Sequence, residues 1–356
     1  MKMPRILVLA TSRRTHGGIS SVVAAHESSD EWRAYGCRWV ATHRSGSALT
    51  KLWYFVRGMM EFLFLLPWAE AVHIHIGEVP SARRKSLFMR LAKLTGKRNV
   101  VHFHAFDTVS TIEGPRASVY KALFDDADCV VVLSKMWKDK VNAVFDLGDK
   151  VTVLYNPCPT VDSAAGVGGD CAKRNVILSA GVVCERKGYG DLIRAFAAIA
   201  PRYKDWRVVF AGSGEIDRAK AIARECGIED QVEFAGWVSG EAKDRIFRET
   251  SVFCLPSYAE GFPMAVLDAW AYGLPVVTTP VGGLPDIVSD GVDVLLFQPG
   301  DVDRLAVQLE RLIADERLRS TIAEASRRFA SETFDVGTVG RHLGEIYSAV
   351  LHSAVD

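Results

Sequence analysis

The chain has 356 residues, which is too long for one ordinary hydrophobic core and favours two domains. Residues 1–160 contain 22 Lys or Arg and 14 Asp or Glu, whereas residues 161–356 contain 21 and 29, so a basic half precedes an acidic half. The seven cysteines are scattered without a Cys-x-x-Cys pair, which indicates buried or free thiols in a reducing compartment.

Neither a leader nor a membrane span is expected. Arg5–Ala10 reads as a short strand without a cleavage site. The most apolar stretch, Leu52–Trp68, is interrupted by Arg57 and Glu61 and is too short and too polar to span a bilayer. We therefore expect a cytoplasmic protein.

Strand-like apolar runs alternate with amphipathic helical segments along the whole chain. In the first half the strands are expected at Arg5–Ala10, Cys37–Thr42, Ala71–Ile76, Asn99–His104, Cys129–Leu133 and Lys150–Tyr155. In the second half they are expected at Val176–Val183, Arg207–Ala211, Gln231–Ala235, Val252–Leu255, Leu274–Thr278 and Val294–Phe297. Helices are expected between them, for example at Tyr189–Ala200, Ile216–Cys226 and Glu241–Thr250. This alternation predicts an α/β fold of two Rossmann-like, doubly wound domains.

The domain boundary is predicted from composition. Residues 160–170 are small, rich in glycine and aperiodic, as a flexible linker is. We therefore expect an N-terminal domain at residues 1–163 and a C-terminal domain at residues 172–334. A last helical segment is expected within residues 335–356, and its own residues do not say which domain it packs on.

Ligands of doubly wound sheets bind beyond the carboxyl ends of the strands, and several polar motifs follow predicted strands. Gly17 and Gly18 follow the first strand and open a helix, where backbone amides can approach a phosphate. An ordinary glycine turn is an equally good interpretation. Arg186 and Lys187 follow the first strand of the second domain, where two cations can neutralise a diphosphate. Surface Arg-Lys pairs are common, so their position at a strand tip is what favours a function.

The segment from Ser257 to Val277 is the most informative in the chain. Glu260 precedes a short helix that Pro263 is suited to begin, Asp268 lies on that helix, and Gly273 can end it. Helix-start amides attract anions, and carboxylates accept hydrogen bonds from sugar hydroxyls. The segment therefore suits a ligand with phosphate and hydroxyl groups, such as a nucleotide sugar.

Two His-x-His pairs end the third and fourth strands, and alternation places both members of each pair on one side. A zinc site is one interpretation, but no carboxylate or cysteine set accompanies the pairs. Satisfied buried side chains are expected for His73 and His102. His75 and His104 lie nearer the strand tips, and His104 is the better candidate for contacting substrate. The Asp126/Asp128 and Asp301/Asp303 pairs are interpreted as structural.

Residues 82–98 carry seven positive charges and no negative ones. Leu87, Leu91 and Leu94 share one helical face, so the segment can lie on an anionic membrane surface. The alternative is a solvated outer helix whose leucines pack on the sheet, and the two can hold together, with the cations on the membrane.

Together these motifs resemble the retaining family-4 glycosyltransferases, which have the GT-B fold of two Rossmann-like domains facing across a cleft. The resemblance is most specific between Val176 and Asp301. It is carried by the segments at 186–188, 211–215, 232–236, 255–257, 260–277, 282–283 and 299–301.

The resemblance implies a role for each matching residue. Glu260 would contact the donor sugar, and Gly261, Phe262 and Pro263 would run beside the sugar and diphosphate. Asp268 would hold the ribose hydroxyls. The residues implied at the diphosphate and the transferring sugar are Arg186, Lys187, Gly17, Gly18 and His104, with Gly212 also among the donor-binding residues. The last helix would cross back to the N-terminal domain.

Two departures from the family pattern concern donor affinity. Asp268 stands where the family has glutamate, so its carboxylate reaches one methylene less far. Val182 stands where many members have arginine, which leaves the phosphate charge to Arg186 and Lys187.

The expected function is transfer of a sugar from a nucleotide sugar, with retention of anomeric configuration and without a metal or other cofactor. The expected acceptor is a polyprenyl-diphosphate-linked saccharide of exopolysaccharide, capsule or O-antigen synthesis, reached at the inner face of the plasma membrane, and no nucleic-acid partner is expected. The alternatives are a non-catalytic GT-B module that binds a nucleotide sugar, and a GT-B nucleotide-sugar epimerase.

Overall fold

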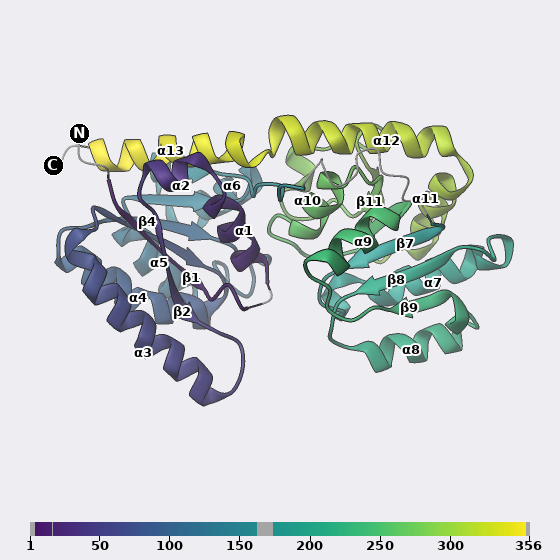
Figure 1. Ribbon diagram of the computed structural model, residues 1–356, viewed down its shortest axis with the longest axis horizontal. Coiled ribbons are helices and arrows are strands. Elements are labelled where there is room, and N and C mark those ends of the chain that lie inside the picture. The colour runs from purple at the N-terminus through teal and green to yellow at the C-terminus, as the bar shows by residue number, and fades with distance from the viewer. Residues whose placement is uncertain (1–3, 16, 162–173, 354–356) are drawn as a thin grey trace. The chain divides into compact units, whose positions relative to one another are not determined.

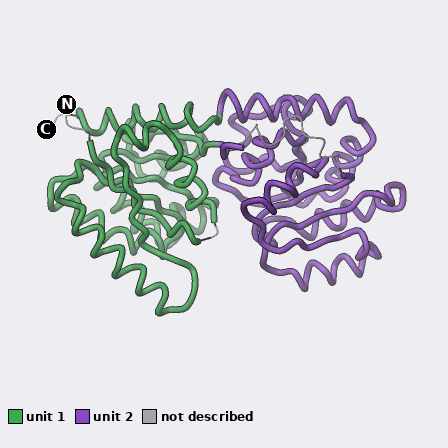
Figure 2. Tube along the Cα trace, in the orientation of Figure 1, with its two compact units in different colours: residues 1–157, 334–356 green, residues 158–333 purple. Residues whose placement is uncertain are grey.

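The computed structural model describes residues 4–15, 17–161 and 174–353. It divides into two compact units, the first formed by Met1–Pro157 with Phe334–Asp356 and the second by Cys158–Thr333 (Figure 2). Most of the predicted linker, from residue 162 to 170, lies outside the described residues. Among the described residues, no helix is both long and apolar enough to cross a membrane.

The first unit is built on a parallel sheet in the order β2-β1-β3-β4-β5-β6 (Figure 1). Its strands are β1 (Ile6–Thr11), β2 (Arg38–His43), β3 (Ala71–Ile76), β4 (Arg98–Phe103), β5 (Cys129–Val132) and β6 (Val151–Val153). Its helices are α1 (Gly18–Glu27), α2 (Asp30–Ala34), α3 (Ala48–Leu65), α4 (Val79–Leu94), α5 (Ala117–Asp126), α6 (Lys135–Phe145) and α13 (Val336–His352), with short turns η1 (Leu66–Trp68) and η2 (Gly148–Lys150).

Helices cover both faces of this sheet because its strands are apolar on both sides. Leu7 and Leu9 of β1 join the core beneath α3, α4, α5 and α6. Ile6 and Val8 point the other way, into a core with α1, α2 and α13. The C-terminal helix α13 therefore packs on the first unit, through residues that include Leu343.

The second unit has a parallel sheet in the order β12-β11-β10-β7-β8-β9. Its strands are β7 (Val176–Ala180), β8 (Arg207–Ala211), β9 (Val232–Phe234), β10 (Val252–Leu255), β11 (Val276–Thr278) and β12 (Leu295–Leu296). Its helices are α7 (Tyr189–Ile199), α8 (Ile216–Glu225), α9 (Glu241–Glu249), α10 (Met264–Ala271), α11 (Val302–Ala314) and α12 (Glu316–Arg328). Short helices are η4 (Glu185–Lys187), η5 (Ala200–Arg202), η6 (Glu229–Gln231), η7 (Leu284–Asp286) and η8 (Phe329–Thr333).

The α/β architecture with two parallel six-stranded sheets is confirmed, and the strands are displaced by only a few residues from their predicted bounds. The largest difference is at Val176–Val183, where β7 ends at Ala180. Gly181 has φ 127° and turns the chain away from the sheet, and Val183 instead forms an isolated bridge to Gly214.

The predicted inner face of the basic helix is wrong. Leu87 and Leu94 of α4 are 45% and 83% exposed, and the buried positions are Val79, Ala82, Lys85, Phe88, Met89 and Ala92. Lys85, expected to point outward with the other cations, is fully buried. Of the three leucines, Leu91 is partly buried against the core, whereas Phe88 and Met89 fill the space beneath the helix and leave Leu87 and Leu94 outside.

Candidate functional site

The charged motifs of the second unit meet where the sheet order reverses. The chain runs from β7 to β8 and β9 on one side, whereas β10 pairs with the other edge of β7. The loop after β7 carries η4, and the loop after β10 carries residues 256–263, so both loops leave the same edge of the sheet at neighbouring strands. This switch point is where ligands bind in doubly wound folds.

Glu260 is the buried centre of this site, with 8% of its surface exposed. Its Oε1 lies 2.5 Å from Nζ of Lys187 and accepts a hydrogen bond of 2.6 Å from Oγ of Ser257. Its Oε2 lies 3.6 Å from Nη1 of Arg186. Two cations and a hydroxyl therefore surround this buried carboxylate and give its oxygens polar partners. The structure therefore brings together the three predicted residues Glu260, Lys187 and Arg186.

Backbone contacts lock the two loops to each other. The Tyr258 amide donates to the Arg186 carbonyl at 2.8 Å, and Nη1 of Arg186 donates to the Ala259 carbonyl at 2.6 Å. Gly188 has φ 68°, and a Cβ there would lie 2.0 Å from the Pro256 carbonyl oxygen. Only glycine allows this approach, so the position of both cations depends on it.

The loop from Gly261 to Pro263 is held from the other side by a glycine turn. Gly282 has φ 63°, and a Cβ there would lie 2.4 Å from the Gly261 carbonyl oxygen. The Gly283 amide donates to that oxygen at 2.8 Å. Phe262 is buried, and Pro263 caps α10 rather than occupying its first helical position as predicted. The helix ends at Ala271 before Gly273, whose φ is 63°, as expected.

Asp268 lies on α10, and its carboxylate forms an ion pair with a lysine. Nζ of Lys243, from α9, is 2.6 Å from its Oδ1. Sequence reasoning missed Lys243, because one lysine in an amphipathic helix carries no signal of its partner. It also left Ser257 and Thr279 out of the site. Thr279 donates to the Ser257 carbonyl at 2.6 Å and so helps to fix the loop that carries Glu260.

Gly212 follows β8, and its environment explains why it is glycine. A Cβ at Gly212 would lie 1.6 Å from the Gly181 carbonyl oxygen. The Gly181 amide donates to the Ala211 carbonyl, so the loops after β7 and β8 are in contact. Packing alone therefore requires this glycine, and its contact with a donor stays a prediction.

The predicted residues of the first unit lie at the carboxyl ends of β1 and β4. Gly17 caps α1 without a side chain, and a Cβ built there would meet nothing within 4 Å. Gly18 is the first residue of that helix, so the backbone is open to a ligand at this point. His104 follows β4, where Nε2 of its ring lies 2.8 Å from Nδ1 of His75.

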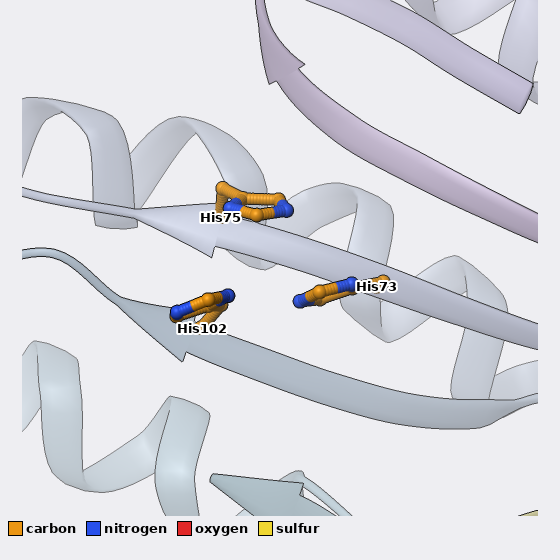
Figure 3. Close-up of side chains that lie close together, drawn as sticks. All are labelled: His73, His75 and His102. Carbon is orange, nitrogen blue, oxygen red and sulfur yellow. The ribbon is translucent and has the colours of Figure 1, made fainter. Parts of the chain in front are cut away.

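The four histidines of the two pairs form one cluster, in which His73, His75 and His102 are buried and His104 is half-buried. Figure 3 shows His73, His75 and His102 on β3 and β4, with a nitrogen of His102 facing a nitrogen of His73. Nδ1 of His73 lies 2.6 Å from the Tyr347 hydroxyl of α13, whereas its Nε2 has no hydrogen-bond partner among the described residues, so the expectation of a satisfied side chain holds for one nitrogen only. The same expectation is wrong for His102, whose two ring nitrogens have no hydrogen-bond partner among the described residues.

Electrostatics keep this cluster neutral. Burial lowers the pKa of His73, His75 and His102 well below the usual value. Burial, followed by the charge of Lys85, lowers the pKa of His104 to about 3. Burial likewise lowers the pKa of Lys85 to about 7, and its amino group donates to the His75 carbonyl. His104 is therefore a neutral hydrogen-bonding group whose orientation is set by His75.

Three of these rings offer nitrogens to a metal ion, but the chemistry fits poorly. The nitrogens of His73, His75 and His102 lie within 4.8 Å of one another. The set contains no anionic ligand, and the Lys85 amino group binds the backbone of one member. Burying a divalent charge beside this amino group is unfavourable.

Three of the four aspartates in the two pairs have structural contacts, and the role of Asp303 stays a prediction. Asp128 accepts a hydrogen bond of 2.7 Å from the Asn99 amide and pairs with Arg98. Asp126 pairs with Lys93. Asp301 caps α11 by accepting from the Arg304 amide at 2.8 Å.

Comparison with known proteins shows what the part of the chain around this site is similar to. Residues 169–329, which contain Glu260, Lys187, Arg186 and Asp268, match the model of the glycosyl transferases group 1. An uncharacterized glycosyltransferase of Methanocaldococcus jannaschii is 27% identical over 238 residues, 62% of this chain. The chain spans only 60% of that relative's length.

The amylovoran biosynthesis glycosyltransferase AmsK of Erwinia amylovora is 26% identical over 78% of this chain and 70% of its own. Among solved structures, Anabaena HepE in complex with UDP-glucose superimposes with a TM-score of 0.74 at 19% identity, over 97% of this chain and 99% of its own. At this identity the likeness shows the fold, which is GT-B.

Proposed function

We propose that the protein transfers a sugar from a nucleotide sugar to an acceptor with retention of anomeric configuration, because residues 169–329 match the model of the glycosyl transferases group 1. The observation that carries the proposal is the buried Glu260 carboxylate between Lys187 and Arg186 at the switch point of the second sheet. The arrangement holds one acid for sugar hydroxyls and two cations for a diphosphate.

The cations act on the leaving group. Negative charge grows on the nucleoside diphosphate as the bond between the anomeric carbon and the phosphate oxygen breaks. Lys187 and Arg186 stabilise that charge, and the rigid loops hold them in place beforehand, which is the condition for electrostatic catalysis. When the donor binds, the two cations exchange part of their contact with Glu260 for the diphosphate. Glu260 then accepts hydrogen bonds from the sugar.

Retention follows from attack on the same face that the diphosphate leaves. The acceptor oxygen forms the new bond to the anomeric carbon, and the acceptor proton passes to a phosphate oxygen of the departing diphosphate. This route needs no carboxylate nucleophile, so Glu260 stays a hydrogen-bond acceptor for the sugar, held by Ser257. We also propose that the reaction needs no metal or other cofactor, because the two cations carry the charge compensation.

Asp268 is proposed to bind the ribose hydroxyls. Lys243 holds this carboxylate at 2.6 Å and orients it on α10, which compensates in part for its shorter reach. His104 and the open backbone at Gly17 and Gly18 are proposed to contact the transferring sugar and the phosphates.

The proposed acceptor is a polyprenyl-diphosphate-linked saccharide of surface-polysaccharide assembly, met at the cytoplasmic face of the membrane. The basic character of residues 1–160 supports an anionic acceptor. The name of AmsK, an amylovoran biosynthesis glycosyltransferase, supports the same class of pathway.

The test is product analysis with a panel of UDP- and GDP-sugars, with and without a polyprenyl-diphosphate saccharide. We expect nucleoside diphosphate release that depends on the acceptor, and a glycosylated lipid whose new anomeric centre has the donor's configuration. If no nucleoside diphosphate is released under any condition, the protein is a non-catalytic module that binds a nucleotide sugar. A changed sugar nucleotide without acceptor would identify an epimerase.

A further inference from the structure

Large apolar side chains point outward along the whole length of α3 in the first unit. They are Leu49, Leu52, Trp53, Val56, Met60, Leu63 and Phe64, and Trp68 follows directly in η1. The four most exposed, Leu49, Trp53, Met60 and Phe64, are 64% to 79% exposed. Single exposed apolar residues are ordinary, but a continuous row of this kind marks an interaction surface.

The row occupies one face because its members recur every three or four residues. The opposite face, with Tyr54, Gly58 and Phe62, is buried against the sheet. A Cβ at Gly58 would lie 2.6 Å from the Ala41 carbonyl oxygen of β2, so the helix backbone rests directly on the strand. This contact fixes the rotation of α3, and the apolar row cannot turn inward.

The neighbouring helix α4 adds positive charge. Its outer stripe is Arg83, Leu87, Arg90 and Leu94, spaced by four, three and four residues and exposed throughout. The two helices cover the same face of the sheet and lie side by side (Figure 1). Phe88 joins them, with ring centroids 5.8 Å from Phe55 and 5.2 Å from Phe62.

Charge selects the occupant of this combined surface. Lys51 and Arg57 are the exposed charged residues of α3, and Glu61 is half-buried. The surface is thus apolar in the middle and cationic at its flanks, with tryptophan and phenylalanine among its apolar members. An anionic lipid bilayer matches this pattern, because its acyl boundary accepts the apolar and aromatic side chains and its headgroups attract arginine. A second copy of the chain fits less well, since self-pairing brings the two arginine stripes together.

We propose that the outer faces of α3 and α4 form a docking surface for anionic membranes, with α3 lying in the plane of the interface. Docking would bring the protein to the lipid-linked acceptor of the proposed function. The inference rests on the proposed function only for this biological role, and the membrane binding itself does not depend on it. It replaces the sequence-based expectation that residues 82–98 provide the membrane contact with their leucines in the core.

Vesicle co-sedimentation without any nucleotide sugar tests the proposal separately from sugar transfer. The full chain is mixed with vesicles of phosphatidylcholine alone or of phosphatidylcholine with phosphatidylglycerol. We expect binding to the anionic vesicles that weakens as salt rises. Trp53→Ser combined with Phe64→Ser should lower the bound-to-free ratio by roughly tenfold or more. Arg83→Gln combined with Arg90→Gln should lower it by roughly tenfold on anionic vesicles alone.

A matched control substitutes exposed valines elsewhere, Val144→Ser with Val307→Ser, and should bind vesicles as the wild type does. Circular dichroism confirms that each variant is folded. The proposal is overturned when the wild type stays in the supernatant with both vesicle types, or when the Trp53/Phe64 variant binds as well as the control. Sedimentation velocity identifies the other occupant, because a wild-type dimer that dissociates in the Trp53/Phe64 variant, without vesicle binding, assigns the surface to a second copy.

Discussion

At the scale of single residues, the site is a balance of charges around one buried acid. Glu260 could be singled out from its place before a short helix, and Arg186 and Lys187 from their place after a strand. Their mutual contact could not be predicted, because it depends on β7 and β10 being neighbours although 71 residues lie between Ala180, where β7 ends, and Val252, where β10 begins. The ion pair of Asp268 with Lys243 could not be predicted for the same reason, because the two residues come from different helices, α10 and α9.

Replacement of Glu260 by glutamine tests its proposed role. The variant keeps the shape and the Ser257 hydrogen bond but leaves Lys187 and Arg186 without their carboxylate. We expect kcat/KM for transfer to fall about 100-fold, the scale of losing one charged transition-state contact. Full activity would refute contact with the sugar. Glu233→Gln, at an exposed position of β9, is the control and should be unaffected.

At the scale of elements, periodicity predicted the order of strands and helices but assigned the wrong face of α4. Its three leucines formed a convincing stripe, yet a buried lysine and the larger Phe88 occupy the inner side. Which face a helix buries depends on the space above the sheet, and a sequence window does not contain that information. The end of α10 was better predicted, since Gly273 with its φ of 63° follows the helix as expected.

Gly188 tests whether loop packing positions the cations. Gly188→Ala introduces a Cβ 2.0 Å from the Pro256 carbonyl oxygen, whereas Gly227→Ala, at nearly the same φ of 69°, meets nothing within 4 Å. We expect Gly227→Ala to cost about 1–2 kcal/mol of unfolding free energy for the left-handed backbone alone. Gly188→Ala should cost clearly more and also abolish transfer. Urea unfolding of both variants measures the difference, and equal losses would contradict the packing argument.

At the scale of the whole molecule, the α/β alternation predicted both sheets, because parallel strands buried on two faces leave strong apolar runs. The packing of α13 onto the first unit could not be derived from its own residues. The histidine cluster was predicted only in part. Strand alternation placed each pair on one side, but it did not predict that His26 of α1 and Tyr347 of α13 lie beside His73.

The buried histidines predict acid sensitivity of the first unit. Burial lowers the pKa of His26 to about 4, so this ring is neutral when folded and titrates near 6.5 when unfolded. The unfolded state binds more protons between these values, so stability is intact above pH 6.5 and falls as the pH drops toward 4. His26 alone contributes roughly 3 kcal/mol to that loss.

Amide hydrogen exchange in β1 and β3, measured on the full chain between pH 6.5 and 4, reports the stability of the first unit. His26→Leu should flatten the pH dependence of protection. His352→Asn, on the exposed end of α13, is the control and should leave it unchanged. An equal pH dependence in His26→Leu and the wild type would show that His26 does not carry this loss.

Binding of nucleoside diphosphates, measured by isothermal titration, tests the central claim that Lys187 and Arg186 hold the diphosphate of the donor. We predict that UDP or GDP binds the wild type, that Lys187→Ala raises the Kd by roughly tenfold or more, and that Lys204→Ala at an exposed site does not. Absence of binding by the wild type, or an unchanged Kd in Lys187→Ala, would contradict the account.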